Sequence, residues 1–307
     1  MDHIMPDIPR FYTALAEWMA CMLFILPLKK RMDRQKTILL MTGALAVQSV
    51  FLVVTGDLAI YFWIPCMVIA VILMIGFIYG CCDVSRTDAV YFGMIAFVVA
   101  EFLASIEWQV VCFFWKGKMP EIWIRALLLI GIYGCIACVL LKTLHTHLPK
   151  DGKMNISPKE LFSAVLIGIA VFAVSNLSFL TSNTPFSGSY SFEIGNIRTL
   201  VDVGGIAILY AHLIQCGELR VKKELEAVQN VLQNQYVQYK QSRESIDLIN
   251  YKYHDLKHQI AVLRSEEDPK KREEFLNRME EGIRQYEAQN KTGNKVLDTV
   301  LTTKSLY

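Results

Sequence analysis

Apolar residues dominate the first two thirds of the chain and gather into seven runs separated by short polar segments. A helix needs about 20 predominantly apolar residues to cross the hydrocarbon core of a bilayer. The runs cover approximately residues 11–28, 37–55, 58–80, 89–113, 122–141, 161–180 and 197–216. Each run comes close to that length, so the pattern predicts an all-α membrane protein with a seven-helix transmembrane domain over residues 1–216.

The polar last third follows a seven-residue repeat of apolar positions. One series consists of Leu225, Leu232, Tyr239, Ile246, Tyr253 and Ile260. The companion series consists of Val221, Val228, Gln235, Ser242, Ile249, Leu256 and Leu263. Such an a/d heptad predicts a coiled coil, which polar Gln235 and Ser242 weaken. No Pro or Gly interrupts Glu218 to Leu263, so we expect a single helix of about 65 to 70 Å.

A second, shorter helix is predicted after the segment "RSEEDPKK", where Pro269 and a cluster of charges end the heptad pattern. Its apolar stripe consists of Phe275, Leu276, Met279, Ile283 and Tyr286. Two such helical hairpins from two copies would bury both stripes in a four-helix bundle, so we expect a homodimer. The expected divisions are a coiled-coil signalling helix at 217–248, a dimerisation hairpin at 249–290 and a final segment at 291–307.

The loops predict the orientation of the spans, because Lys and Arg accumulate on the cytoplasmic side of membrane proteins. The connections "KKRMDRQK" and "KTLHTHLPKDGKMNISPK" are basic, whereas "TSNTPFSGSYSFEIGN" and the short "GD" connection contain no Lys or Arg. Two lysines in "WKGKMPE" run mildly against this pattern. We therefore expect the N-terminus outside and everything after Cys216 in the cytoplasm.

Composition narrows the classes of partner and site. The chain is 53% apolar and 20% charged, with a formal net charge of +2. No exposed run is purely basic, which argues against nucleic-acid binding. Most of the eight cysteines lie within or beside apolar runs, where cysteine behaves as a small hydrophobic residue. Cys135 and Cys138 form a CxxC without a second ligand pair, so we predict no metal site.

A few ionisable residues interrupt the apolar runs: Glu17, Glu101, Arg125, Arg198 and Asp202. A charge at membrane depth is costly unless it faces the bundle interior and finds a partner, so such residues are functional candidates. Arg198 and Asp202 lie one helical turn apart and could simply pair. Glu101 has no partner nearby in sequence. We take Glu101, Arg198 and Asp202 as candidate residues for sensing a ligand.

The heptad helix carries a concentrated polar motif in "INYKYHDLKHQIAVL" at 249–263. With Tyr253 at position a, His254 takes b, Asp255 takes c and His258 takes f, so these side chains point away from the seam. Three interpretations are open: a solvated helix face, a zinc site from two histidines without a clear third ligand, or a phosphoacceptor. A neutral imidazole keeps a nucleophilic nitrogen, and a neighbouring carboxylate can orient the ring and accept its proton.

The segments "IDLINYKYHDLKHQIAVLR" and "KTGNKVLDTVLTTKSLY" resemble bacterial sensor histidine kinases with a GHKL-type ATPase, the group that includes quorum-peptide receptor kinases. The resemblance covers about residues 217–307, and the spans are similar only in number and orientation. It implies that His254 accepts phosphate and Asp255 acts as the general base, with Lys257 and His258 in the same catalytic motif. His258 stands where many members carry Asn, so a dephosphorylating role is not implied.

The resemblance further implies a two-component membrane sensor that uses ATP and Mg²⁺ in its full-length form and passes phosphate to an aspartate of a cytoplasmic response regulator. The regulator that often accompanies this group is of the LytTR type. The expected location is the bacterial cell membrane, and the signal is an unknown small molecule or peptide. No Asn-rich nucleotide box, Gly-rich lid or Walker loop appears, so we interpret 291–307 as the truncated start of the ATP-binding domain and expect this chain alone to bind no ATP.

The alternative function is a non-enzymatic seven-span receptor or scaffold that dimerises through its coiled coil. A transporter is disfavoured, because the spans show no evident inverted repeat and no paired helices broken by Gly or Pro.

Overall fold

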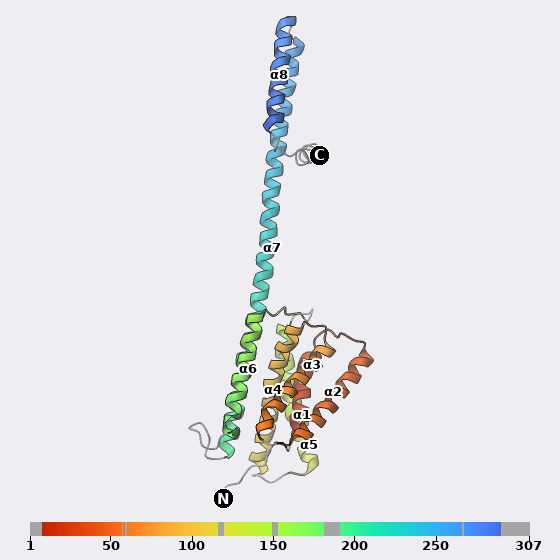
Figure 1. The fold of residues 1–307 in the computed structure, drawn as a ribbon, viewed down its shortest axis with the longest axis vertical. Coiled ribbons are helices and arrows are strands. Elements are labelled where there is room, and N and C mark those ends of the chain that lie inside the picture. Colours follow the sequence, from red (N-terminus) through yellow and green to blue (C-terminus); the bar gives the residue numbers. More distant parts are fainter. Residues whose placement is uncertain are drawn as a thin grey trace. The chain divides into compact units, whose positions relative to one another are not determined.

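The computed structural model of this protein describes residues 8–56, 58, 60–115, 120–148, 153–180, 191–265 and 267–289. Over these residues the regular secondary structure consists of α-helices, and no β-strand is present among them (Figure 1). The helices are α1 (Arg10–Ile25), α2 (Arg34–Thr55), α3 (Ile60–Cys81), α4 (Arg86–Trp115), α5 (Ile122–His147), α6 (Pro158–Leu180), α7 (Ser191–Ser265) and α8 (Pro269–Gln289). The prediction of an all-α membrane protein is confirmed.

Six of the described helices are long and apolar enough to cross a membrane: α2 to α6 and the N-terminal part of α7. The remaining predicted span, at 11–28, corresponds to the shorter helix α1, which has 16 residues and a length of about 24 Å. It ends before Pro27, which has no N–H to continue the helix. The Lys30 ammonium group donates hydrogen bonds to the carbonyls of Leu26 at 3.1 Å and Leu28 at 2.7 Å, a favourable position for a cation at a helix C-terminus.

Helix α4 is the central helix of the membrane part. It packs against α1, α3, α5 and α6, and most of its side chains are buried. By contrast, α2 and α5 present large apolar side chains outward, including Leu39 at 73% exposed and Leu127 at 72%. In water such surfaces would be unfavourable, but on a membrane-spanning helix they face acyl chains. The burial pattern therefore separates a helix inside the bundle from helices that face the lipid.

Small residues allow close approach between neighbouring helices in the bundle. A Cβ atom added at Gly93 in α4 would collide with Ile75 in α3. One added at Gly205 in α7 would lie 2.7 Å from both Cγ atoms of Val171 in α6. Helices in membranes associate by such tight packing, because lipid chains are as apolar as the side chains themselves.

The segment before α6 is fastened to the first turn of α4. The fully buried Asp88 carboxylate accepts hydrogen bonds from the backbone N–H of Asn155 at 3.4 Å and of Ile156 at 3.0 Å. Asn155 has a φ of 52°, a left-handed conformation that Asn tolerates better than most residues. Ser157 and Glu160 then form a reciprocal capping box, which starts α6.

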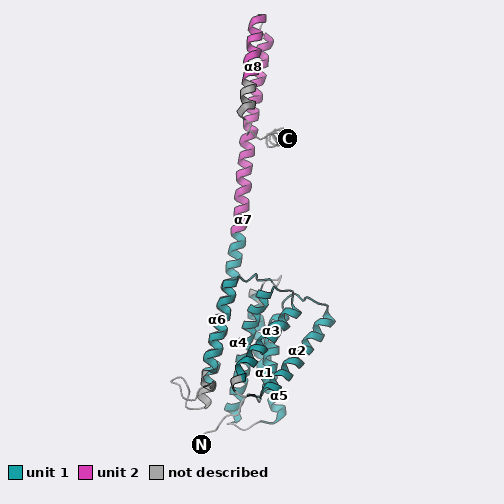
Figure 2. Ribbon diagram, in the orientation of Figure 1, with its two compact units in different colours: residues 1–225 teal, residues 226–307 magenta. Residues whose placement is uncertain are grey.

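The described chain divides into two units, Met1–Leu225 and Glu226–Tyr307 (Figure 2). In the second unit, the polar part of α7 continues to Ser265, and α8 turns back beside the end of α7 (Figure 1). Asp268 begins α8 by accepting a hydrogen bond from the Lys270 N–H at 3.0 Å, with Pro269 in the first helical position. Phe275 and Met279 on α8 are half-buried. The segment 291–307, predicted to begin an ATP-binding domain, lies outside the described residues.

Candidate functional site

A row of polar side chains joins α4 to α7 inside the membrane part. On α4 the row consists of Glu101, Ser105 and Gln109, spaced four residues apart and therefore on one face of the helix. Gln109 donates a hydrogen bond to the Asn196 side chain and accepts one from the Thr199 hydroxyl at 2.7 Å. Gln109 therefore forms polar contacts with two residues of α7.

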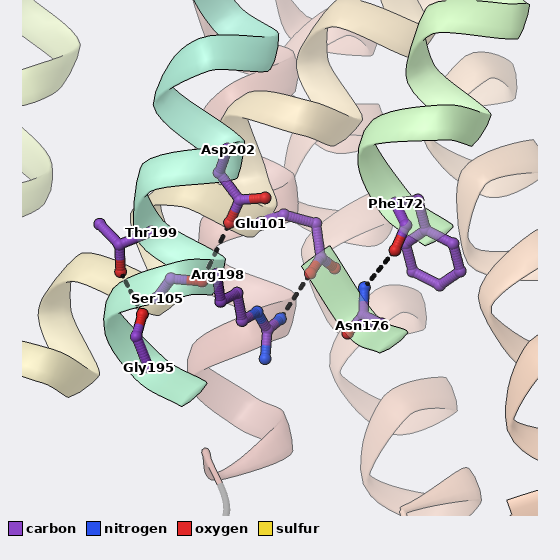
Figure 3. Close-up of polar contacts among 8 residues, drawn as sticks. All are labelled: Glu101, Ser105, Phe172, Asn176, Gly195, Arg198, Thr199 and Asp202. Carbon is purple, nitrogen blue, oxygen red and sulfur yellow. Dashed lines mark hydrogen bonds and ion pairs between the residues drawn. The ribbon is translucent and has the colours of Figure 1, made fainter. Parts of the chain in front are cut away.

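The strongest contact in this row is an ion pair between Glu101 and Arg198. The Arg198 Nη2 atom lies 2.5 Å from the Glu101 Oε2 atom, and the two side chains are 14% and 5% exposed (Figure 3). Glu101 lies about halfway along the 30-residue α4, where an unpaired charge would be most costly. The partner that Glu101 lacks in its neighbourhood along the chain thus comes from α7, 97 residues away.

Asp202 occupies the same α4–α7 interface. The Ser105 hydroxyl donates a hydrogen bond to its Oδ2 atom at 3.1 Å (Figure 3), and Asp202 is fully buried. Its other carboxylate oxygen, Oδ1, makes no hydrogen bond to the part of the chain that the structure describes. The Ser175 hydroxyl of α6 is close enough to interact with this carboxyl, although it too makes no hydrogen bond of good geometry to a described residue.

Another buried carboxyl lies where α1 meets α2. Gln48 donates hydrogen bonds to the Glu17 carboxylate and, at 3.5 Å, to the carbonyl of Ala70 in α3. Glu17 is 1% exposed, and it is close enough to Glu101 for the two carboxyls to interact electrostatically. Three helices of the bundle therefore contribute carboxyl groups that interact in a chain: Glu17 from α1, Glu101 from α4 and Asp202 from α7.

Aromatic rings surround the other basic residue of the bundle, Arg125 in α5. Its guanidinium carbon lies 4.2 Å from the ring centre of Tyr12 and 5.3 Å from that of Trp108. These distances are typical of cation–π contacts. Glu107, fully buried in α4, interacts electrostatically with this guanidinium. The arrangement neutralises a second charged group without exposing it to lipid.

A smaller polar contact between α4 and α7 lies near the N-terminal end of α4. The Tyr91 hydroxyl lies 3.0 Å from Nδ1 of His212, and the Cys216 thiol lies 3.6 Å from the same atom. Four residues further along α7, Arg220 donates a hydrogen bond to the carbonyl of Lys153. The segment before α6 is thus held by α4 through Asp88 and by α7 through Arg220.

The predicted phosphotransfer motif lies on the second unit, on the polar part of α7. His254, Asp255, Lys257 and His258 are all exposed. The carboxylate of Asp255 accepts a hydrogen bond from the side chain of Gln259 at 3.1 Å. His254 is therefore accessible to solvent in the single chain, as its predicted role requires. The phosphate transfer predicted for it depends on a reaction partner.

The sequence reasoning found Glu101, Arg198 and Asp202 but missed the hydroxyl and amide groups that complete the site. A usable signal was present, because Glu101, Ser105 and Gln109 form a polar stripe with a four-residue period inside an apolar run. No comparable signal marks Ser175, since a lone Ser in a membrane helix usually bonds to its own backbone.

Among the described residues, no group of three or more His, Cys, Asp or Glu side chains is arranged to hold a metal ion. A Mg²⁺ ion of the kind that the kinase resemblance implies therefore has no fitting ligand set among these residues. Comparison with known proteins found no match among family models, curated proteins or solved structures.

Proposed function

We propose that this protein is the membrane sensor of a bacterial two-component system, in which His254 accepts a phosphoryl group and passes it to an aspartate of a response regulator of the LytTR type. The observation that carries the proposal is the exposed His254–Asp255 pair on the side of α7 away from its apolar seam. The proposal places the N-terminus outside the bacterial cell membrane and the second unit in the cytoplasm.

The reaction requires an exposed neutral imidazole. One ring nitrogen of His254 attacks the γ-phosphorus of ATP, a P–N bond forms, and the P–O bond to the leaving ADP breaks. Asp255 orients the ring and stabilises the positive charge that develops on it, and the ring proton leaves from the other nitrogen. A regulator carboxylate then attacks the same phosphorus and restores the imidazole. The described residues form no nucleotide-binding domain, so the proposal assigns ATP binding to a GHKL-type domain.

The apolar seam supports a homodimer as the working form. Its side chains are exposed on the single chain, including Leu225 at 57%, Ile246 at 54% and Ile249 at 59%. A long stripe of this kind is stabilised by a second helix of the same pattern. A second copy supplies that helix in register, since each copy presents the same a and d positions.

The candidate sensing residues support regulation through α7. Arg198 and Asp202 lie on α7, and each contacts α4 through a side chain rather than the backbone. Such contacts can exchange partners when a ligand or a change in the membrane favours another arrangement, and packed helices respond by small shifts. We propose that the signal, a peptide or other small molecule, acts by changing these contacts.

The test is phosphorylation of the protein in membranes that also contain a GHKL-type ATP-binding domain, with ³²P-labelled ATP and peptide mass spectrometry at neutral pH. The label is expected on His254, in an acid-labile and alkali-stable bond. His254→Ala abolishes it, whereas the control Tyr251→Ala, at an exposed residue outside the four motif residues and the apolar seam, retains it. Persistent labelling of His254→Ala would refute the assignment.

The same experiment separates this proposal from a non-enzymatic receptor. A receptor that only dimerises would show cross-linking along α7, at a cysteine placed at Ile246, but no label on any histidine. A kinase would show both, and transfer of the label to a response regulator would follow within minutes of mixing.

A further inference from the structure

We propose that the junction of α4, α6 and α7 binds a monovalent cation of the size of Na⁺, held by the Asp202 carboxylate with the hydroxyl groups of Ser105 and Ser175. This inference goes beyond histidine phosphorylation and does not depend on it, because its readouts are cation binding and thermal stability. The site would add a cation response to a helix, α7, that already carries the candidate sensing residues.

The geometry supplies several oxygen atoms at one point of the bundle. The Ser105 hydroxyl lies 3.1 Å from Asp202 Oδ2, and the Ser175 hydroxyl of α6 interacts with the same carboxyl. In Figure 3 the second oxygen of Asp202 points away from Ser105, on the side where Glu101 lies. These groups come from three helices, so a bound ion would join the helices together.

Two of these oxygens are buried without a hydrogen bond to the described residues: Asp202 Oδ1 and Ser175 Oγ. Asp202 is 0% exposed and Ser175 is 2% exposed. A buried oxygen that lacks a donor costs the free energy of its lost hydration, about 1 to 3 kcal/mol and more for a charged group. A hydrogen bond from the Ser175 hydroxyl could pair these two oxygens, but it would leave the carboxylate charge in place, whereas a cation between them would contact both oxygens and also neutralise that charge.

The charges of the region also favour a cation. Three buried acids interact electrostatically in this region. Glu17 interacts with Glu101, and Glu101 interacts with Asp202. Arg198 is the basic group that acts on this set, and its ion pair goes to Glu101. Arg198 also acts electrostatically on Asp202, yet one guanidinium carries one positive charge against three carboxyl groups, so a cation would improve the charge balance of this region.

The kind of ligand favours Na⁺ over a divalent or transition metal. Hydroxyl and carboxylate oxygens are hard ligands, whereas zinc and similar metals prefer His and Cys. Calcium takes six to eight oxygens, commonly with several carboxylates. At this junction one carboxylate is available beside two hydroxyl groups, and the other, Glu101, is engaged by Arg198. One negative charge matches one monovalent cation.

The test uses the purified full chain in lipid nanodiscs at constant ionic strength, with Na⁺ exchanged for N-methylglucamine. Saturable binding of ²²Na⁺ and a matching, saturable rise of the unfolding temperature are expected. Asp202→Asn abolishes both. Ser105→Ala and Ser175→Ala weaken the apparent affinity by about tenfold or more, the range found when groups that support a bound metal are removed.

Ser49→Ala is the matched control, because Ser49 in α2 is also a buried hydroxyl without a hydrogen bond to the described residues. It keeps the Na⁺ affinity within about twofold, well below the tenfold loss expected at the site. If Asp202→Asn does not fold, the two serine variants still decide the question. Equal stabilisation by Na⁺ and N-methylglucamine, or stabilisation by acid alone, would show that the ion is absent or that Asp202 takes a proton, and would overturn the proposal.

Discussion

The buried ion pair between Glu101 and Arg198 gives the sharpest prediction about stability. Its two charge centres lie about 4 Å apart, which corresponds to about 4 kcal/mol of attraction at an effective dielectric constant of 20. Removing one partner leaves the other charge buried and uncompensated, at a cost of about 3 to 5 kcal/mol. Glu101→Gln and Arg198→Gln are therefore each expected to lower the free energy of unfolding by about 3 kcal/mol or more, whereas the double variant loses less than their sum.

Equilibrium unfolding in mixed dodecyl sulfate micelles, followed by circular dichroism, measures this double-mutant cycle. Neutral hydrogen bonds between membrane helices contribute about 0.6 kcal/mol on average and at most about 1.7, so a coupling above about 2 kcal/mol identifies an ion pair. The exposed pair Arg220–Glu224, at 2.9 Å, is the control and is expected to couple by less than about 0.5 kcal/mol. Additive effects of the two buried substitutions would refute the reasoning.

Three further predictions concern packing, the loop before α6 and the seam. Gly93→Ala is expected to lower the free energy of unfolding by about 1 to 3 kcal/mol, because the added Cβ would collide with Ile75. The control Gly43→Ala, where no atom lies within 4 Å of the added Cβ, is neutral or slightly stabilising. Thermal unfolding compares the two variants. Asp88→Ala removes an acceptor from two backbone N–H groups and should speed proteolysis of the segment before α6, and an unchanged cleavage rate would contradict the role given to its carboxylate. Gln235→Leu removes one of the two polar residues from the predicted seam and should strengthen self-association of the protein in sedimentation measurements, and weaker association would contradict the heptad assignment.

The hydrophobic pattern alone determined much of the fold. Runs of apolar residues located α1 to α6 and the start of α7 within a few residues of their observed bounds, because a helix that crosses lipid must satisfy its own backbone and be apolar for about 20 residues. The second helix was predicted to follow the segment "RSEEDPKK", whereas α8 begins within that segment at Pro269, since proline is well tolerated at the first helical position. The largest differences are at the end of α5, which continues to His147 instead of 141, and at the start of α7, which begins at Ser191 instead of 197. The run at 11–28 includes Pro27 and extends past the end of α1.

The candidate site required the tertiary structure. Arg198 and Asp202, one turn apart, suggested a local pair, yet Arg198 forms its ion pair with Glu101 and Asp202 accepts a hydrogen bond from Ser105. Periodicity gives the face of one helix, but it does not say which helix packs against that face. Contacts of that kind depend on how the helices are ordered in the bundle, and a single sequence carries little information about this order.

The sequence by itself determined which segments are helical and which of them suit a membrane, because these properties follow from residue spacing along one chain. The same spacing predicts that His254 points away from an apolar seam. Only the tertiary structure decided that α4 is the central helix, that its polar stripe meets α7, and that Asp202 and Ser175 bring unsatisfied oxygens into one junction. The physical reason is that burial and partner choice belong to pairs of surfaces, which exist only once the helices are packed.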